Sequence, residues 1–485
     1  MMQEFNDIQD YLIPHAVGVG LSAVGGILLA IWISGALKSN ARKRAKLLKK
    51  VATSNSPEVI NPEKTDEQSP KIPGVAARPF QIAGITTDPN LPCKHIFIPA
   101  TTGAGKTQVL HTCLDRVLWG CDHRPGMEKA LITDPSGSFY ATRGGKDDLI
   151  LNPFDKRTVD WSPFAEIREE SDWDMLARAV MPDSPIPQKQ EWVEYGRSLL
   201  VDVMRQLQIQ GKADVRYVSN LVVRASIDEL SEYLVNTESE ILVHPGSEKL
   251  LQSVRFQVGD GIRAWRYLNP EGKFSIRDWV DHGTGAMFLT YQESQFDSMK
   301  PLVGAWLSLA IRQTLSLPED FDRRVWFVMD ELDSLGKVDF LKDALARGRK
   351  YGLACISTIQ TISQEDATYG HDTSKTLRSN HVSKIIMKQG SNEDAEYWSK
   401  EIGDEEKWMD AHSTGSSTGG PMGMQSSSGT NSTLQVRRSV LGSELMALPE
   451  RTGFAILADR QNIVKFSIPL TKYPKKNEPF IKKEG

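Results

Sequence analysis

Residues 97–107 have the sequence FIPATTGAGKT, in which a glycine-rich turn lies between a predicted strand and a predicted helix. The apolar run at 95–98 predicts a strand, and apolar residues at helical spacing over 109–118 predict a helix. Gly103 and Gly105 allow a tight turn in which successive backbone N–H groups point at phosphate oxygens, and the helix N-terminus adds positive potential. This order of strand, glycine turn and helix predicts a phosphate-binding loop in an α/β fold.

The phosphate-binding loop predicts a site for a nucleoside triphosphate, with ATP and Mg²⁺ as the expected ligands. Lys106 is expected to reach the β- and γ-phosphates, and the Thr107 hydroxyl is expected to ligate Mg²⁺. Ala100 departs from the usual pattern, which begins with glycine at this position. The residues expected to contact the nucleotide are Thr102, Gly103, Ala104, Gly105, Lys106, Thr107 and Gln108.

A second part of the site is predicted at residues 325–331, where the apolar run VWFVM precedes Asp330 and Glu331. Such a run is typical of a buried parallel strand with carboxylates at its C-terminal end. Asp330 is expected to hold Mg²⁺, and Glu331 is expected to polarise the attacking water as a general base. Further strands are predicted at 130–133, 286–290, 353–358, 382–387 and 454–457. Alternating strands and helices predict a doubly wound, mostly parallel, twisted sheet with the ligand at its carboxyl edge.

Two features near the strand at 353–358 have more than one interpretation. Gln360 follows this strand, where it is either a sensor of the γ-phosphate or a capping or surface amide. The basic turn ARGRKYG at 346–352 precedes the strand and follows a helix predicted at 338–345. A cation in this turn either reaches the nucleotide of a neighbouring subunit or offsets the dipole at the helix end.

The N-terminal region predicts a membrane anchor over residues 1–50. Residues 11–37 contain no Asp, Glu, Lys or Arg, and residues 16–37 are long and apolar enough to span a bilayer. Basic residues follow between Lys38 and Lys50, so the positive-inside rule places the bulk of the chain in the cytoplasm. A cleaved signal peptide and an interfacial helix are the alternatives.

Composition and periodicity divide the rest of the 485 residues into a linker, a nucleotide-binding domain in two parts and an all-α domain. Residues 51–75 are rich in Pro, Ser and charged residues, as in a linker. The nucleotide-binding domain is expected at 76–170 and 266–485, interrupted by an all-α domain at 171–265. Residues 411–435 are rich in Ser, Gly and Thr, which predicts a flexible loop. The amphipathic helical patterns of the all-α domain cover 173–180, 190–208, 219–235 and 247–264.

Charge and cysteine content limit the classes of function. The formal net charge of −4 excludes nucleic-acid binding through bulk positive charge, so such a role requires local basic patches or the inside of a ring. The 4 cysteines have no metal-ligand spacing, which favours reduced structural thiols over a zinc site.

Several motifs in a fixed order carry a resemblance to a known family. They are the phosphate-binding loop, Asp134–Phe139, Leu151–Asp155, Trp161–Phe164, Phe274–Trp279, Asp330-Glu331, Arg347–Gly352, Ile359-Gln360, Val440–Leu445 and Leu448-Pro449. With these motifs the chain resembles the type IV secretion coupling proteins of bacterial conjugation, of the TraD/TraG type. The resemblance covers most of the part predicted to be cytoplasmic.

The resemblance implies a RecA-like P-loop NTPase that is anchored in the bacterial inner membrane and assembles as a homo-hexamer. It implies that Asp330 and Glu331 are the magnesium acids, that Arg349 acts on the nucleotide of the adjacent subunit, and that Gln360 is the sensor. The implied partners are single-stranded or double-stranded DNA, a relaxase with accessory relaxosome proteins, and inner-membrane components of the secretion channel. The all-α domain is implied to cap the ring entrance. The single predicted span at 16–37 departs from the two spans of many members.

The expected function is an ATP-driven motor that couples relaxase-bound DNA to a type IV secretion channel and translocates single-stranded DNA during conjugation. One alternative is a membrane-anchored platform that recruits relaxosome and substrate proteins, in which ATP only stabilises the ring. A partition-type DNA pump with the same site chemistry is the other alternative.

Overall fold

The computed structural model describes residues 59–60, 79–417 and 425–483. The predicted membrane helix at 16–37 and nearly all of the predicted linker at 51–75 lie outside these residues. Within the described residues, no helix combines the length and the apolar character that crossing a bilayer requires.

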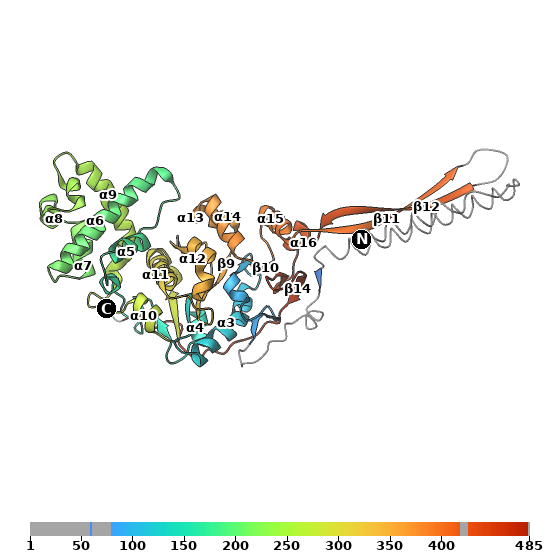
Figure 1. Ribbon diagram of the computed structural model, residues 1–485, viewed down its shortest axis with the longest axis horizontal. Coiled ribbons are helices and arrows are strands. Elements are labelled where there is room, and N and C mark those ends of the chain that lie inside the picture. The colour runs from blue at the N-terminus through green and yellow to red at the C-terminus, as the bar shows by residue number, and fades with distance from the viewer. Residues whose placement is uncertain (1–58, 61–78, 418–424, 484–485) are drawn as a thin grey trace, which may run out of the picture. The chain divides into compact units, whose positions relative to one another are not determined.

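The chain divides into two compact units, which are described separately. The larger unit comprises the described residues up to Gly403 and those from Arg438 onward, and the described part of the smaller unit is residues 404–417 and 425–437. The strands of the larger unit (Figure 1) are β1 (Val59–Ile60), β2 (Phe80–Ile82), β3 (Ile85–Thr87), β4 (Ile96–Pro99), β5 (Glu128–Pro135), β6 (Leu149–Ile150), β7 (Ala286–Tyr291), β8 (Arg324–Met329), β9 (Leu353–Ile359), β10 (Ser383–Met387), β13 (Thr452–Ile456) and β14 (Ile463–Ser467).

Ten of these strands form one sheet in the order β1-β14-β13-β10-β4-β9-β8-β5-β7-β6, and β2 and β3 form a separate antiparallel pair. Neighbouring strands of the large sheet are parallel except at β13, which runs antiparallel to both β10 and β14. This arrangement confirms the expected α/β class with a mostly parallel sheet. Because β4 pairs with β9 and β9 pairs with β8, the carboxyl ends of these three strands meet at one edge.

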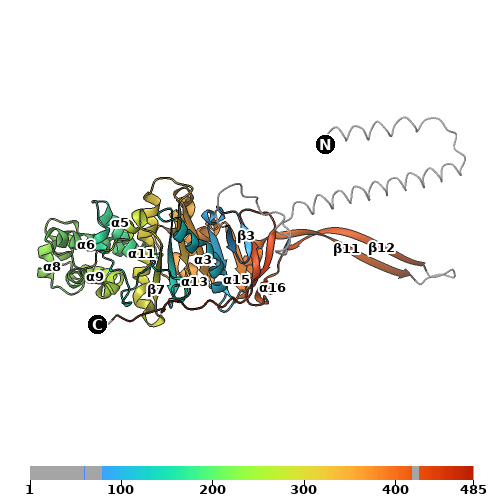
Figure 2. The ribbon, with the colours of Figure 1, turned by 90° about the horizontal axis from the view of Figure 1, so that it is seen from below.

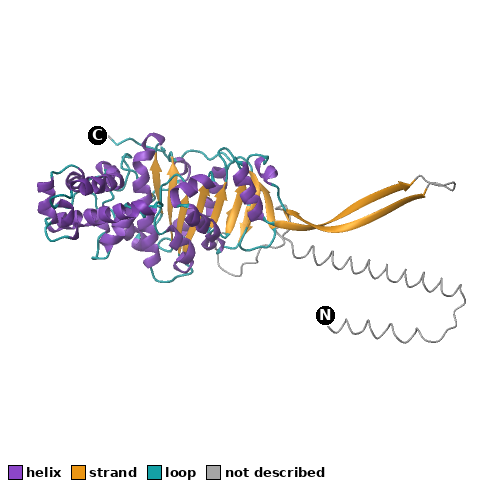
Figure 3. Ribbon diagram, turned by 90° about the horizontal axis from the view of Figure 1, so that it is seen from above, coloured by secondary structure: helices purple, strands orange, loops and turns teal. Residues whose placement is uncertain are grey.

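Helices pack on both faces of this sheet and form two buried cores, as the colours of Figure 3 help to follow. Phe327 of β8 packs in the same core as Trp306, whereas its neighbour Val328 packs in the core that contains Leu114. Strands buried on both faces explain the near-continuous apolar runs of the sequence. The helices outside the 172–267 region are α3 (Lys106–His123), α4 (Ser138–Arg143), α10 (Ile276–His282), α11 (Phe296–Ser316), α12 (Leu341–Arg347), α13 (Ile362–Tyr369), α14 (His371–Asn380), α15 (Asn392–Ile402) and α16 (Gly442–Met446).

Every regular element between residues 172 and 267, hereafter the helical region, is a helix. The helices of this region gather at one end of the larger unit (Figures 1 and 2). The amphipathic stretch at 219–235 spans parts of two helices, because the Ser226 side chain accepts a hydrogen bond of 3.1 Å from the Glu229 N–H and starts a new helix. The α-helices of the region are α5 (Asp172–Val180), α6 (Gln190–Ile209), α7 (Val215–Val223), α8 (Ile227–Leu234) and α9 (Glu248–Ile262).

The residues after β14, here called the C-terminal tail (469–483), run back along the larger unit toward the helical region (Figure 2). The Thr471 N–H donates to Gln108 Oε1 of α3 at 3.1 Å. Near the end of the tail, the Lys483 N–H donates to the Phe154 carbonyl at 2.9 Å. The tail therefore joins the phosphate-loop helix to residues that follow β6, a path that no periodic pattern in the sequence predicts.

In the described part of the smaller unit, β11 (Asp404–Ser417) and β12 (Gln425–Arg438) pair as a two-stranded sheet. Glu405 and Arg437 form an ion pair of 2.7 Å between them. This corrects the flexible loop expected at 411–435, because both flanks of that segment lie in paired strands. Strand pairing uses backbone N–H and C=O groups, so a segment rich in Ser, Gly and Thr can form a hairpin without an apolar core.

Candidate functional site

The phosphate-binding loop follows β4 at the carboxyl edge of the sheet and leads into α3. Gly103 and Gly105 have φ values of +74° and +101°, which L side chains rarely adopt, so both positions favour glycine. A side chain at position 105 would also collide with Arg451, whose N–H donates to the Ala104 carbonyl at 2.8 Å. Ala100 is fully buried and does not have a positive φ, which explains why alanine fits where the usual pattern has glycine.

Lys106, the first residue of α3, is only 9% exposed. Its Nζ donates a hydrogen bond of 3.1 Å to the Ala100 carbonyl. Burial lowers the pKa of Lys106, and the charges of Asp330, Glu331 and Asp333 oppose that shift. The fold therefore brings the predicted phosphate lysine close to the predicted acids.

Asp330 and Glu331 come directly after β8, and Thr358 of β9 bonds to both. The Thr358 hydroxyl donates to Asp330 Oδ1 at 2.8 Å and accepts from the Glu331 N–H at 2.9 Å. Burial raises the pKa of Asp330 to about 6, with a further contribution from the Glu331 charge. Carboxylate and hydroxyl oxygens are the ligands that Mg²⁺ prefers, and Thr107 presents an exposed hydroxyl at the start of α3. The residues present thus fit a magnesium ion.

Gln360 joins the phosphate-binding loop to the acids. Its Nε2 donates to Glu331 Oε1 at 2.7 Å, and its Oε1 accepts from the Thr102 hydroxyl at 3.1 Å. Its own N–H donates to Asp333 Oδ2 at 3.2 Å. The helix that follows is capped by Thr361 rather than by Gln360. Gln360 is thus held between the loop and Glu331, and its role as a sensor of the γ-phosphate stays a prediction.

Arg349 is the predicted residue that the fold does not bring to this site. It lies in a 3₁₀ turn (Gly348–Tyr351) before β9, whereas Gln360 follows the other end of that strand. The 7 residues of β9 separate the two by about 20 Å at 3.3 Å per residue. The Arg349 side chain is exposed, and its guanidinium has no hydrogen bond or ion pair within the described part of the chain.

Two acids at the site carried no predicted role. Asp333, 6% exposed, accepts from the Gln360 N–H through one oxygen, while its Oδ1 has no partner within the residues described. Asp134, at the end of β5, accepts from the N–H groups of Phe139 and Tyr140 at 2.9 and 2.7 Å, and burial raises its pKa to about 7. The available signal for Asp134 was an acidic residue near the C-terminal end of an apolar strand, whereas Asp333, four residues after β8, had no such signal.

Gln108, predicted to contact the nucleotide, accepts instead a hydrogen bond from the C-terminal tail at Thr471. Its side chain is half-buried, in contrast to the exposed Thr102 and Thr107 of the same loop. The tail is thus a neighbour of the phosphate-loop helix, and the nucleotide contact of Gln108 stays a prediction.

Comparisons with known proteins agree with this geometry. A family model described as "Type IV secretion-system coupling protein DNA-binding domain" matches residues 79–469. The coupling protein TraD of Escherichia coli K12 is 28% identical over 401 residues, which cover 79% of this chain and 54% of TraD. A conjugal transfer protein TraG of Escherichia coli is 24% identical over 330 residues, covering 58% of this chain and 50% of TraG. The chain spans about half the length of these relatives.

Solved structures give the same result for the fold. The unbound conjugative coupling protein TrwBdeltaN70 matches with a TM-score of 0.78 at 28% identity, over 88% of this chain and 96% of that one. The plasmid coupling protein TrwB in complex with ADP and Mg²⁺ matches with a TM-score of 0.78 at 28% identity, over 88% and 97%. The large, mostly parallel sheet fits the RecA-like class. The chain belongs to the family of type IV secretion-system coupling proteins.

Proposed function

We infer that this chain is an ATP-driven motor that couples relaxase-bound DNA to a type IV secretion channel and translocates single-stranded DNA during conjugation. The observation that carries this proposal is the hydrogen-bonded path from Thr102 through Gln360 to Glu331, beside Lys106 and Asp330. TrwB, with 28% identity to this chain, has been solved with ADP and Mg²⁺ and with the ATP analogue ADPNP. These relatives support nucleotide and magnesium as ligands.

In the proposed hydrolysis, the residues of the site neutralise phosphate charge, hold the metal ion and activate a water. Backbone N–H groups of the loop and the Lys106 ammonium neutralise charge on the β- and γ-phosphates. Asp330 and Thr107 would hold Mg²⁺, which adds positive charge at the same oxygens when bound. Glu331 orients a water for attack and accepts its proton, and Gln360 reports the presence of the γ-phosphate to Glu331 through the hydrogen bond between them.

Arg349 is proposed to act on the nucleotide of the adjacent subunit in a homo-hexamer. The length of β9 keeps Arg349 away from Lys106 and Gln360 of its own chain. An exposed guanidinium that has no partner among the described residues is available to a second copy. In this assembly the bulk of the chain is cytoplasmic, the predicted span at 16–37 anchors it in the inner membrane, and its partners are the relaxosome proteins and the channel components.

Conjugative transfer with the full chain tests the motor. Glu331→Gln and Lys106→Ala are each expected to abolish DNA transfer and to reduce DNA-stimulated ATP hydrolysis by at least about 10²-fold, while docking of the relaxosome is retained. A Glu331→Gln chain that hydrolyses no ATP and still supports transfer would overturn the motor in favour of the recruitment platform. A partition-type pump predicts ATP turnover that is independent of relaxosome components.

A further inference from the structure

A pocket of about 420 Å³ lies where the helical region meets the nucleotide-binding part of the larger unit. The helical region contributes residues 179–185, Lys189 and the end of α9, and the other wall comes from the start of α11 and from Gly336-Lys337. The volume lies in the range of sites for small ligands. None of these residues belongs to the phosphate-binding loop or its acids.

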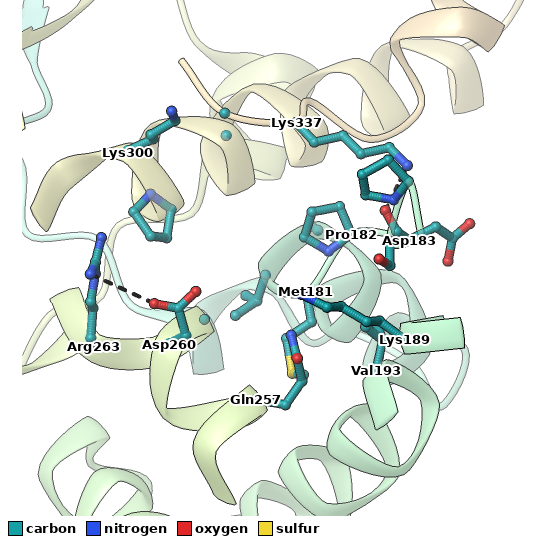
Figure 4. A pocket seen from close by; sticks show the side chains of 18 residues that line it. Met181, Pro182, Asp183, Lys189, Val193, Gln257, Asp260, Arg263, Lys300 and Lys337 are labelled. Atoms are coloured by element: carbon teal, nitrogen blue, oxygen red, sulfur yellow. Dashed lines mark hydrogen bonds and ion pairs between the residues drawn. The ribbon is translucent and has the colours of Figure 1, made fainter. Parts of the chain in front are cut away.

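Four basic side chains and two acidic ones line this pocket. In Figure 4, Lys300 and Arg263 lie at one end, and Lys189 and Lys337 lie at the other. Arg263 and Lys337 are engaged: Arg263 pairs with Asp260 at 3.6 Å, and Lys337 donates to the Asp183 carbonyl at 2.6 Å. Lys189 and Lys300 have no hydrogen bond or ion pair from their ammonium groups to other described residues.

The charges favour a phosphate that carries a single negative charge. Positive groups at both ends of the pocket attract an anion, whereas the carboxylates of Asp183 and Asp260 repel a dianion more strongly than a monoanion. A phosphodiester carries one negative charge per residue of a strand, and lysines at both ends permit the strand to continue past the pocket. Lysine contacts to phosphates are independent of base sequence.

The pocket is also linked to the proposed hydrolytic site through one loop. Lys337 lies six residues after Glu331, and both Glu331 and Gly336 have positive φ, +56° and +83°. Between them, the Asp333 carbonyl accepts from the Thr368 hydroxyl at 3.1 Å. The loop therefore connects Glu331 to Lys337 over a short distance in sequence and is anchored between them to the helix that contains Thr368.

On this basis we propose that the pocket binds one phosphodiester group of a single-stranded DNA, with Lys189 and Lys300 as its principal contacts. This inference rests on the proposed DNA motor and assigns a DNA contact to it. Lys337 both lines the pocket and lies six residues after Glu331, so the proposed DNA contact and the proposed general base are joined by one short loop.

The test compares the full chain with Lys189→Gln/Lys300→Gln and with the control Lys146→Gln/Lys249→Gln, which removes two exposed lysines elsewhere. Fluorescence anisotropy measures binding of a labelled single-stranded oligonucleotide across a salt titration. The pocket variant is expected to bind about tenfold more weakly, and the slope of log K against log salt is expected to shrink by about 0.7 per lost phosphate contact. The control is expected to match wild type. Unchanged DNA-free ATP turnover and circular dichroism confirm that the variants are folded.

The outcomes separate this inference from the motor itself. If wild type binds the oligonucleotide and the pocket variant binds it equally well with the same salt slope, the pocket assignment is wrong and the motor stands. If wild type binds no oligonucleotide, the motor proposal fails first. The assignment would also be wrong if the two lysines were needed to bind inorganic phosphate or an acidic peptide but had no effect on oligonucleotide binding.

Discussion

The carboxyl ends and the amino ends of the parallel strands form two edges of the ten-stranded sheet. The edges differ in whether their polar side chains find hydrogen-bond partners within the same chain. At the carboxyl edge, Glu331 and Gln360 hydrogen-bond to each other, and Asp330 accepts from Thr358. At the amino edge, Arg349 is exposed and its guanidinium has no partner among the described residues. This difference between the edges is the reason for the proposal that Arg349 acts on the nucleotide of a second copy.

Burial shifts the pKa of titratable groups at both edges. Burial raises the pKa of Asp134 to about 7 and that of Asp330 to about 6 at the carboxyl edge. Next to the amino ends of β4 and β10, burial lowers the pKa of His95 to about 4 and that of His381 to about 3. Burial thus disfavours the charged form at both places: it favours protonated Asp134 and Asp330 at the carboxyl edge and neutral His95 and His381 at the amino edge.

Among the substitutions that test the difference between the two edges, Arg349→Ala is expected to have the largest effect on ATP turnover. ATP turnover in the presence of DNA should fall about 10³-fold, because an arginine that neutralises charge on the transferring phosphoryl group contributes at least this much. Nucleotide affinity, measured by titration, should be retained because Lys106 binds the phosphates. Arg347→Ala is the matched control, since Arg347 is exposed and pairs with Asp343 in its own chain at 2.7 Å.

Mixing subunits sharpens this prediction. Arg349→Ala chains still carry Lys106, and Lys106→Ala chains still carry Arg349, so mixed rings contain complete sites and should recover part of the turnover. Absence of recovery at every mixing ratio would give Arg349 a role within its own chain and remove the distinction between the edges.

Glu331→Gln is expected to reduce turnover by about 10² to 10³-fold, the usual loss when a general base is removed. Gln keeps the size of the side chain, so the variant should still bind ATP and accumulate it uncleaved. Single-turnover hydrolysis with retained nucleotide measures both quantities. Glu450→Gln, which alters an exposed carboxylate beside Arg451, is the control. Wild-type turnover in Glu331→Gln would show that the base lies elsewhere.

Gln360→Ala is expected to slow turnover about tenfold, which corresponds to about 1.4 kcal/mol, because it removes one hydrogen bond to Glu331 and one to Thr102. Gln364→Ala, four residues further along and exposed, should behave as wild type. Maximal turnover and ATP affinity are both measured, because a sensor of the γ-phosphate affects turnover and a binding residue affects affinity. A loss of affinity at unchanged maximal turnover would make Gln360 a binding residue only.

The smallest effect concerns stability at the amino edge. His381 is neutral in the folded chain because its pKa is lowered to about 3, and the unfolded chain takes up a proton near pH 6.5. Above pH 6.5 both states hold this histidine neutral, and its titration costs no stability. As the pH falls, proton uptake by the unfolded chain lowers the free energy of unfolding, by about 2 kcal/mol between pH 7 and pH 5.

Urea unfolding at both pH values checks this contribution. His381→Gln, which keeps a polar group near the Ser357 hydroxyl, should lose less stability on acidification than wild type by about that amount. Exposed His123 provides the control, His123→Gln. An equal loss in His381→Gln and wild type would contradict the assignment of this pH dependence to His381.

The sequence predicted the parts of the site that depend on local pattern. The strand, glycine turn and helix around Lys106 have a local signature, and parallel strands with polar ends predict that Asp330 and Gln360 meet at one edge. The α/β class and the helical character of 171–265 follow from periodicity for the same reason.

What could not be predicted depends on contacts between distant segments. Asp333 differs from any polar loop residue only through its contact with Gln360, which the sheet brings near. The path of the C-terminal tail rests on contacts with segments far away in the sequence, such as those of Thr471 with Gln108 and of Tyr473 with His111, which local patterns do not encode. The pairing of β11 with β12 likewise depends on backbone groups within a segment whose composition is typical of a loop.

The position of β4 in the sheet has a consequence for biosynthesis. In its pairing with β9, Ile96 lies opposite Ile356, 260 residues later in the chain. At translation rates of about 5 to 20 residues per second, the ribosome needs roughly 13 to 50 s after Ile96 to make that partner. During this interval the nascent phosphate-loop strand lacks both of its neighbours, β9 and β10, so the loop, Asp330 and Gln360 come together only once the C-terminal part of the sheet has emerged.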